Sequence, residues 1–185
     1  MRTTRASNNG PFDQPAVFSP DGKLRYALVR QWGKGEGEHE TVNFIMCNPS
    51  TADDVDDDPT IRRCVDFAQR WEYHRLIVTN VNPFRSPWPS ALQSAVLSAE
   101  DWATNDRYIR EAADASALVV ACWGTDAPRG MAARALRVLD DMPLYCLGLN
   151  ADCSPKHPLY VPGTQQLEPF VPPTGIGPTP DHTVR

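Results

Sequence analysis

Amide, imidazole and hydroxyl side chains follow four apolar segments of this chain, and side chains of these types can hold water, donate hydrogen bonds and bind phosphate. The segments are FIMCNPS (44–50), LIVTNVNPF (76–84), LVVACWG (118–124) and SPKHPLY (154–160). An apolar run that ends in Asn, Pro, Gly, Ser or His is typical of the carboxyl end of a strand, and open α/β sheets bind ligands at that edge. The pattern therefore predicts that the four segments meet in one site.

Three asparagines supply amides at these strand ends. Asn48 precedes Pro49, whose rigid backbone would hold the amide at the edge of the sheet, where it could orient a water or cap its own turn. We expect Asn80 and Asn82 to point to opposite faces of the sheet, so that at most one of them enters a given pocket. An Asn amide carries the donor and the acceptor needed to bind the edge of a base, and turn formation before Pro83 is the structural alternative.

His157 is the strongest single candidate for a catalytic group. It lies between Pro155 and Pro158, which restrict the backbone around the imidazole. Phe84, Trp88 and Trp123 lie in or next to the same loops, and their rings could stack on a flat ligand. Packing in the core is the alternative for these aromatics, and it weighs more for Trp123 than for Trp88.

Hydroxyl and basic side chains in the same loops are candidates for binding phosphate or DNA. Ser50, Ser86 and Ser154 are each next to a proline and could present hydroxyls to phosphate oxygens. Arg85 and Lys156 stand beside two of these serines and would add positive charge.

Five aspartates between positions 53 and 58 form an acidic cluster. Hard cations prefer carboxylate ligands, but the cluster lacks the glycine and the closing glutamate of an EF-hand. Asp57 and Asp58 are explained by the helix that follows, since acidic residues stabilise a helix N-terminus. We therefore predict no metal and no cofactor, and keep Asp53 as a further candidate for the pocket.

Strands alternate with helices along the chain, which predicts an α/β fold. Asp58 is a natural N-cap before Pro59, and Ile61, Val65 and Ala68 would share one helix face. We expect a three-layer α/β/α sandwich with a mostly parallel sheet, in which the first two strands form an N-terminal β-hairpin. The expected strands are 24–32, 41–47, 76–81, 117–123 and 144–149, and further helices are expected near 99–113 and 127–141.

Length and composition predict a single α/β domain over residues 16–162, with a flexible N-terminal arm at 1–15 and a Pro/Gly-rich tail at 163–185. The chain has 185 residues, is 41% hydrophobic and contains no apolar run of membrane-spanning length or signal-peptide type. We expect a cytoplasmic monomer. The formal net charge of −5 argues against a global nucleic-acid footprint, and five cysteines without a CxxC pair predict buried thiols.

The segments CNPSTADDVDDDPTIRRC, TNVNPF, WGTDA and KHPLY resemble the bacterial and phage family known as domain of unknown function 1643, over about residues 16–162. A more distant resemblance links CNPS, IVTN, VVACWG and KHPLY, in that order, to the motifs of the uracil-DNA glycosylase superfamily. That resemblance implies that Asn48 positions the attacking water, Asn80 reads the base edge and His157 stabilises the departing base.

The resemblance implies a DNA glycosylase-like enzyme that flips a modified or damaged base out of DNA and cleaves its N-glycosidic bond, in DNA repair or modification. The partner would be DNA or a nucleotide with a modified base. Two alternatives remain open: a transferase or hydrolase that acts on a nucleotide or modified base with the same fold, and a catalytically silent nucleic-acid-binding module.

Overall fold

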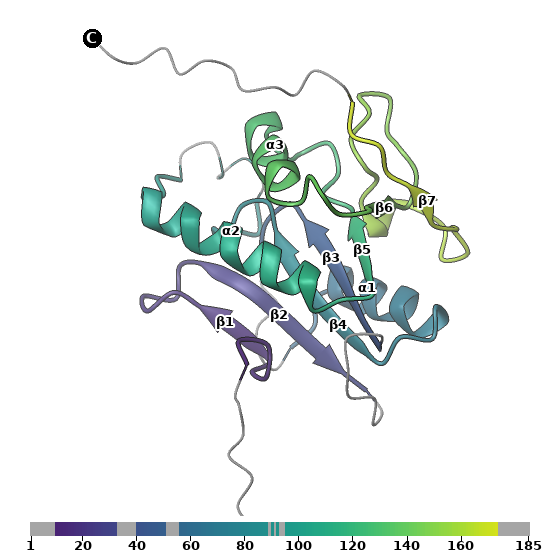
Figure 1. Cartoon of the computed structure of the whole chain (residues 1–185), viewed down its shortest axis with the longest axis horizontal. Coiled ribbons are helices and arrows are strands. Elements are labelled where there is room, and N and C mark those ends of the chain that lie inside the picture. The colour runs from purple at the N-terminus through teal and green to yellow at the C-terminus, as the bar shows by residue number, and fades with distance from the viewer. Residues whose placement is uncertain are drawn as a thin grey trace, which may run out of the picture.

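The computed structural model describes residues 10–32, 40–50, 56–88, 90, 92 and 95–173. The strands are β1 (Ala16–Phe18), β2 (Arg25–Gln31), β3 (Thr41–Met46), β4 (Arg75–Asn80), β5 (Leu118–Ala121), β6 (Tyr145–Cys146) and β7 (Glu168–Pro169). The helices are α1 (Pro59–Arg70), α2 (Ala99–Asp114) and α3 (Arg129–Val138), and a short 3-10 helix, η3, covers Pro158–Tyr160. The fold is α/β, as predicted (Figure 1).

The sheet is mixed, so the prediction of a mostly parallel sheet is wrong. Its strand order is β1-β2-β4-β3-β5-β6-β7. Only the central strands β4, β3, β5 and β6 are parallel, whereas β1, β2 and β7 pair antiparallel, which gives three pairings of each kind. The βαβ units build the parallel centre, and the segments outside these units add antiparallel strands at its edges.

The predicted pairing of the first two expected strands is also wrong. β2 pairs with β1 and β4, so β4 separates it from β3. All six residues of β3 are buried, and β3 uses both of its edges to pair with the parallel strands β4 and β5. No edge of β3 is left for β2, and the N-terminal hairpin is formed by β1 and β2 instead.

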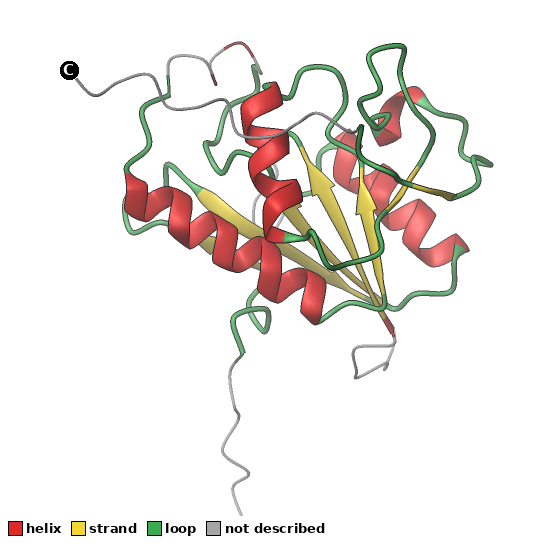
Figure 2. Cartoon of the chain, turned by 45° about the horizontal axis from the view of Figure 1, so that its top comes forward, coloured by secondary structure: helices red, strands yellow, loops and turns green. Residues whose placement is uncertain are grey.

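Helices cover both faces of the sheet (Figure 2). On one face, Ile61 and Phe67 of α1 pack in a cluster that contains Phe44 of β3. On the other face, Ile109 of α2 and Ala135 of α3 belong to a second cluster. Alternate residues of each central strand therefore enter two different cores, which fixes the face to which every strand-end side chain points.

The start of α1 agrees with the sequence prediction. Asp58 is the N-cap, and its Oδ1 accepts a hydrogen bond from the backbone N–H of Ile61 at 2.8 Å, while Pro59 occupies the first turn. This geometry matters for the site because the N-terminus of α1 lies beside the carboxyl end of β3. Helix α2 begins at Ala99, as expected. The structure also shows a capping box at its start, formed by Ser98 and Asp101.

Part of the segment expected to be a C-terminal tail packs against the sheet. Strand β7 pairs with β6, and Phe170 is 5% exposed with its ring edge-to-face on Trp123. Residues 174–185 and the first nine residues of the expected N-terminal arm lie outside the described residues. Among the helices that the structure describes, none has the length and apolar character needed to span a membrane.

Candidate functional site

A cavity lies where the order of the central parallel strands reverses. From β3 the chain passes through α1 to β4 on one side, and then through α2 to β5 on the other side of β3. Such a switch point leaves a crevice at the carboxyl ends of the strands. A cavity of about 350 Å³ occupies this position, and we call it the amide cavity. Its lining includes Arg25, Met46, Asn48, Ser50, Asp58, Val78, Asn80, Ser86, Trp88, Trp123, Gly124, Asp126, His157 and Tyr160.

Asn80 is the most unusual side chain of the amide cavity. It is the last residue of β4, is 1% exposed and shares the α1 face of its strand with Val78. Neither its Nδ2 nor its Oδ1 has a hydrogen-bond partner among the described residues. A buried amide without partners costs free energy, so its donor and its acceptor are available to a ligand that enters the cavity.

Asn48 is held in one orientation by its own donors. Its Nδ2 donates to the carbonyl oxygens of Pro49 at 3.0 Å and of Ser86 at 2.8 Å. An amide nitrogen has two hydrogens, so both donors are engaged. The contact to Ser86 also ties the loop after β3 to the loop after β4. The side-chain oxygen is the group that remains to accept a hydrogen bond from a water or a ligand.

His157 presents a neutral imidazole to the amide cavity. Its Nδ1 accepts a hydrogen bond from the backbone N–H of Leu159 at 3.3 Å, so the proton of the neutral ring is on Nε2 and can be donated. Desolvation lowers the pKa of His157 below its ordinary value of 6.5, although Asp126 and Asp58 oppose this shift. Gly124, with a φ of +75°, allows the close approach of the two loops, because a Cβ there would lie 3.3 Å from Cβ of His157.

Two carboxylates line the amide cavity near His157, and both act on its pKa. Asp58 caps α1, so its position is fixed by the helix. Asp126 is exposed in the loop after β5. Burial, together with the negative charge of Asp126, raises the pKa of the Cys47 thiol to about 12. Asp126 is thus the carboxylate of the cavity that the fold does not use for capping.

Several residues predicted for the site lie elsewhere. Asn82 points to the other face of the sheet, where its Oδ1 accepts from the N–H of Phe84 at 2.8 Å and its Nδ2 contacts Sδ of Met131 at 3.2 Å. Phe84 itself lines a separate cavity near the β1–β2 connection. The guanidinium of Arg85 lies over the ring of Phe18.

Lys156 is also outside the amide cavity, since its side chain runs beside Gly148. Asp53 lies outside the described residues. Of the residues expected to bind phosphate, Ser50 and Ser86 line the cavity. The hydroxyl of Ser86 already bonds to the backbone of Trp88, accepting from its N–H and donating to its carbonyl at 3.0 Å each.

Comparison with known proteins identifies one family. The family model described as Protein of unknown function (DUF1643) matches residues 25–159, which is well over half of the 185 residues. The chain belongs to the DUF1643 family. No curated protein matches the chain. No solved structure matches it either. The matched range contains Asn48, Asn80, Asp126 and His157, so the core of the amide cavity lies within the family's own region.

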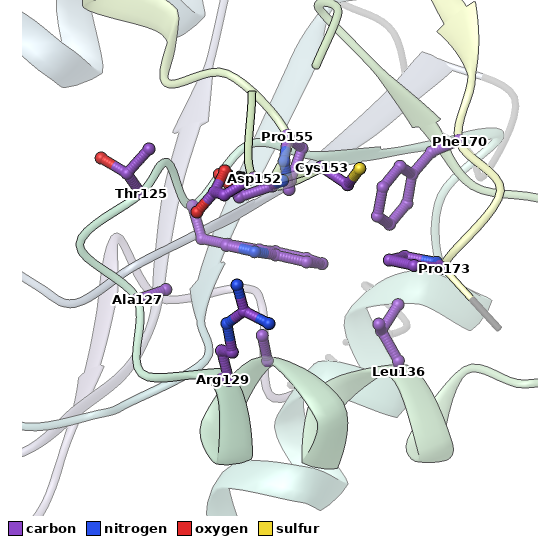
Figure 3. Close-up of a pocket in the computed structure, with 12 residues that line it drawn as sticks. Thr125, Ala127, Arg129, Leu136, Asp152, Cys153, Pro155, Phe170 and Pro173 are labelled. Carbon is purple, nitrogen blue, oxygen red and sulfur yellow. Dashed lines mark hydrogen bonds between the residues drawn. The ribbon is translucent and has the colours of Figure 1, made fainter. Parts of the chain in front are cut away.

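A second cavity adjoins the amide cavity in this DUF1643 protein. It has a volume of about 410 Å³, shares Trp123 and Thr125 with the amide cavity and also contains Ser154. Figure 3 shows Arg129 rising from α3 into this space, with Phe170 on the opposite wall. The hydroxyl of Ser154 donates to Asp152 at 2.6 Å. The lining of this second cavity is mainly apolar and includes neither Asn48 nor Asn80.

Sequence reasoning missed Arg25, Asp126 and Tyr160 as lining residues of the amide cavity, whereas Trp88, one of the predicted aromatics, does line it. Asp126 was detectable, because it lies two residues beyond Gly124, the last residue of one of the four strand-end segments. Arg25 was not, because its direction depends on an irregularity in the pairing of β1 and β2.

The described residues contain no group of three or more His, Cys, Asp or Glu side chains that could hold a metal ion. Four of the cysteines, Cys47, Cys64, Cys122 and Cys146, are buried, and Cys153 is exposed. Burial raises the pKa of all four buried thiols. A buried thiol with a raised pKa is a poor nucleophile, so these four cysteines serve packing in this DUF1643 protein.

Proposed function

We propose that this DUF1643 protein hydrolyses the N-glycosidic bond between a modified or damaged base and its sugar. The observation that carries the proposal is the buried Asn80 amide, whose donor and acceptor both lack partners in a cavity at the switch point of the sheet. A base edge offers the complementary acceptor and donor side by side. A cavity of about 350 Å³ lies in the size range of small-molecule sites.

The residues beside Asn80 suit the remaining steps of the reaction. The Oδ1 of Asn48 accepts a hydrogen bond from the attacking water, and Asp126 receives the proton that this water loses. The water oxygen bonds to C1′ of the sugar, and the C1′–N bond breaks with its electron pair passing to the base. The released base then takes a proton from solvent, so the products are the free base and the sugar hydroxyl.

His157 supports the departure of the base. Negative charge develops on the base as the bond breaks, and a donor held in a desolvated site stabilises such charge more strongly than water does. The neutral ring with its proton on Nε2 is such a donor. The helices on both faces of the sheet are consistent with the uracil-DNA glycosylase-like sandwich that the sequence motifs imply.

The position of the basic residues bears on the form of the substrate. Arg85 and Lys156 lie outside the amide cavity, and Arg63 of α1 donates to the carbonyl of Val161 at 2.7 Å. The net charge of −5 and the positions of these basic residues leave few contacts for a phosphate backbone. They favour a substrate that is bound mainly through its base, either in DNA or as a free nucleotide. Both forms therefore belong in the test.

The test compares Asn80→Ala with Asn82→Ala. Asn80 is the last residue of β4 and Asn82 follows two residues later, but Asn82 points away from the amide cavity. Oligonucleotides and nucleosides that carry uracil, hypoxanthine or hydroxymethylated or glycosylated pyrimidines are incubated with each protein, and strands are treated with hot alkali to cut abasic sites. We expect one base to be released by the wild type and by Asn82→Ala, with a loss of about 100-fold in Asn80→Ala.

Equal release by the wild type and Asn80→Ala would contradict the role of this amide. If the wild type releases no base from any of these substrates, the proposal that it is a glycosidase for them is wrong. Both variants are assayed below their unfolding transitions, because Asn82 is itself buried and its loss lowers stability.

A further inference from the structure

We propose that Arg25 binds the base in the amide cavity and stabilises the negative charge that develops on it. Arg25 stands on β2, is 2% exposed and lines the same cavity as Asn80. The inference rests on the function proposed above and narrows its substrate class to bases that leave as anions.

A β-bulge gives Arg25 its direction. Val17 and Phe18 are consecutive in β1, but they pair with Ala27 and Arg25, so Tyr26 is an extra residue in β2. An extra residue reverses the alternation of side chains beyond it, and bulges near functional sites re-aim side chains in this way. Without the bulge, Arg25 would share the face of Ala27.

The surroundings of the bulge agree with this direction. The ring of Tyr26 stacks on Tyr108 of α2 with centroids 5.3 Å apart, so Tyr26 lies on the α2 face of the sheet. Arg25 lies on the opposite face, with Val78 and Asn80 of the neighbouring strand β4. Arg25 therefore lines the amide cavity from β2, next to the strand that carries Asn80.

The cavity has opposite charges at its two ends. Arg25 comes from β2, and Asp126 comes from the loop after β5, with β4 and β3 between these strands. Three strand spacings separate β2 from β5, a distance of about 14 Å. Asp58 adds a second carboxylate at the N-terminus of α1.

This polarity matches the charge separation of glycosidic bond cleavage. The sugar becomes positive and the base negative as the bond breaks, and fixed charges of the opposite sign lower the energy of that state. The sugar would then lie near the carboxylates and the base between Asn80 and Arg25. Arginine suits the second role because its planar guanidinium binds two acceptor atoms at once.

Binding of two free bases tests the inference without turnover. At neutral pH 5-nitrouracil is an anion, whereas thymine has a similar size and is neutral. We expect calorimetric titration of the wild type to give tighter binding of 5-nitrouracil. Arg25→Gln should lose about ten- to a hundredfold in affinity for the anion and change little for thymine, because a hydrogen bond to a charged group is lost.

Two further variants control the comparison. Arg25→Lys keeps the charge and should keep most of the preference for the anion. Arg85→Gln removes a positive charge outside the amide cavity and should bind both bases as the wild type does. Circular dichroism melting checks that Arg25→Gln is folded, since Arg25 is buried.

The outcomes separate the two proposals. A wild type that binds thymine as tightly as 5-nitrouracil would overturn the inference, even if Arg25→Gln does not fold. An unchanged preference in folded Arg25→Gln would overturn it as well. Arg25-dependent binding of the anion, together with no base release from any substrate, would support the binding role and reject only the hydrolytic reaction.

Discussion

The ionisation of His157 links the chemistry of the cavity to the stability of the protein. Burial lowers the pKa of this imidazole below 6.5, its ordinary value, so the unfolded chain binds the proton at a higher pH than the folded chain does. Folding is therefore opposed as the pH falls from about 6.5 through the lower pKa of the folded state. The neutral ring, and with it the donor on Nε2, persists to a pH below 6.5.

We predict that the free energy of unfolding decreases more steeply below pH 6.5 in the wild type than in His157→Gln. Urea unfolding of both proteins between pH 4.5 and 8 measures their free energies of unfolding. The difference between the two curves reports on His157, because the other titratable groups are the same in both proteins. NMR titration of the His157 ring should give a pKa below 6.5 in the folded protein. A pKa above 6.5, or parallel stability curves, would contradict the desolvated neutral ring.

The strand-end asparagines could be predicted from sequence, whereas Arg25 could not. Asn48 and Asn80 follow buried apolar runs. The opposite directions of Asn80 and Asn82 do not follow from side-chain alternation, which places residues two apart on the same face. They arise because β4 ends at Asn80 and the chain leaves the strand there. The direction of Arg25 depends on a bulge opposite Phe18, which is set by the pairing of two strands and leaves no local pattern. The unpartnered state of the Asn80 amide likewise depends on neighbours that only the fold assembles.

At the scale of elements, the N-terminus of α1 serves both the helix and the amide cavity. The carboxylate of Asp58 caps the helix through the N–H of Ile61, and its charge raises the pKa of His157. The two roles can be separated by substitution, because Asn caps a helix about as well as Asp but carries no charge.

We predict that Asp58→Ala lowers the free energy of unfolding by about 0.5–2 kcal/mol, whereas Asp58→Asn changes it by a few tenths. Both variants should lower the pKa of His157 further, since each removes a nearby negative charge. Urea unfolding and NMR titration measure the two effects. Equal stability losses in both variants would mean that the charge, and not the cap, stabilises α1.

Local sequence patterns predicted the central helices and strands well, but they did not predict which strands pair with one another. The cap at Asp58, Pro59 and the apolar runs of β3, β4 and β5 are encoded within a few residues each. The partner of β2 depends on which strand edges remain after β3 has paired on both sides. Strand β7 contains only Glu168 and Pro169, too short for any alternation to reveal it.

At the scale of the whole molecule, the C-terminal segment closes the second core. Phe170 packs edge-to-face on Trp123 with ring centroids 5.7 Å apart, and Trp123 lines both the amide cavity and its apolar neighbour. Support for the loop after β5, which carries Asp126, therefore comes from a segment far away in the sequence.

We predict that Phe170→Ala lowers the free energy of unfolding by about 3 kcal/mol, because a buried aromatic ring is lost. Val171→Ala is the matched control: it is the next residue and is 77% exposed, so it should change stability by less than about 0.5 kcal/mol. Urea unfolding followed by tryptophan fluorescence measures both. A loss in Phe170→Ala as small as in the control would show that Phe170 does not support the core.

The central claim is that an N-glycosidic bond is cleaved in the amide cavity. Mass spectrometry of both products tests this claim most directly. Each candidate substrate is incubated with the wild-type protein, and the free base and the sugar-containing product are quantified together. The account predicts one substrate that yields free base and base-free sugar in equal amounts. A base that changes mass while it stays attached to its sugar would contradict the account and identify the protein as a base-modifying enzyme.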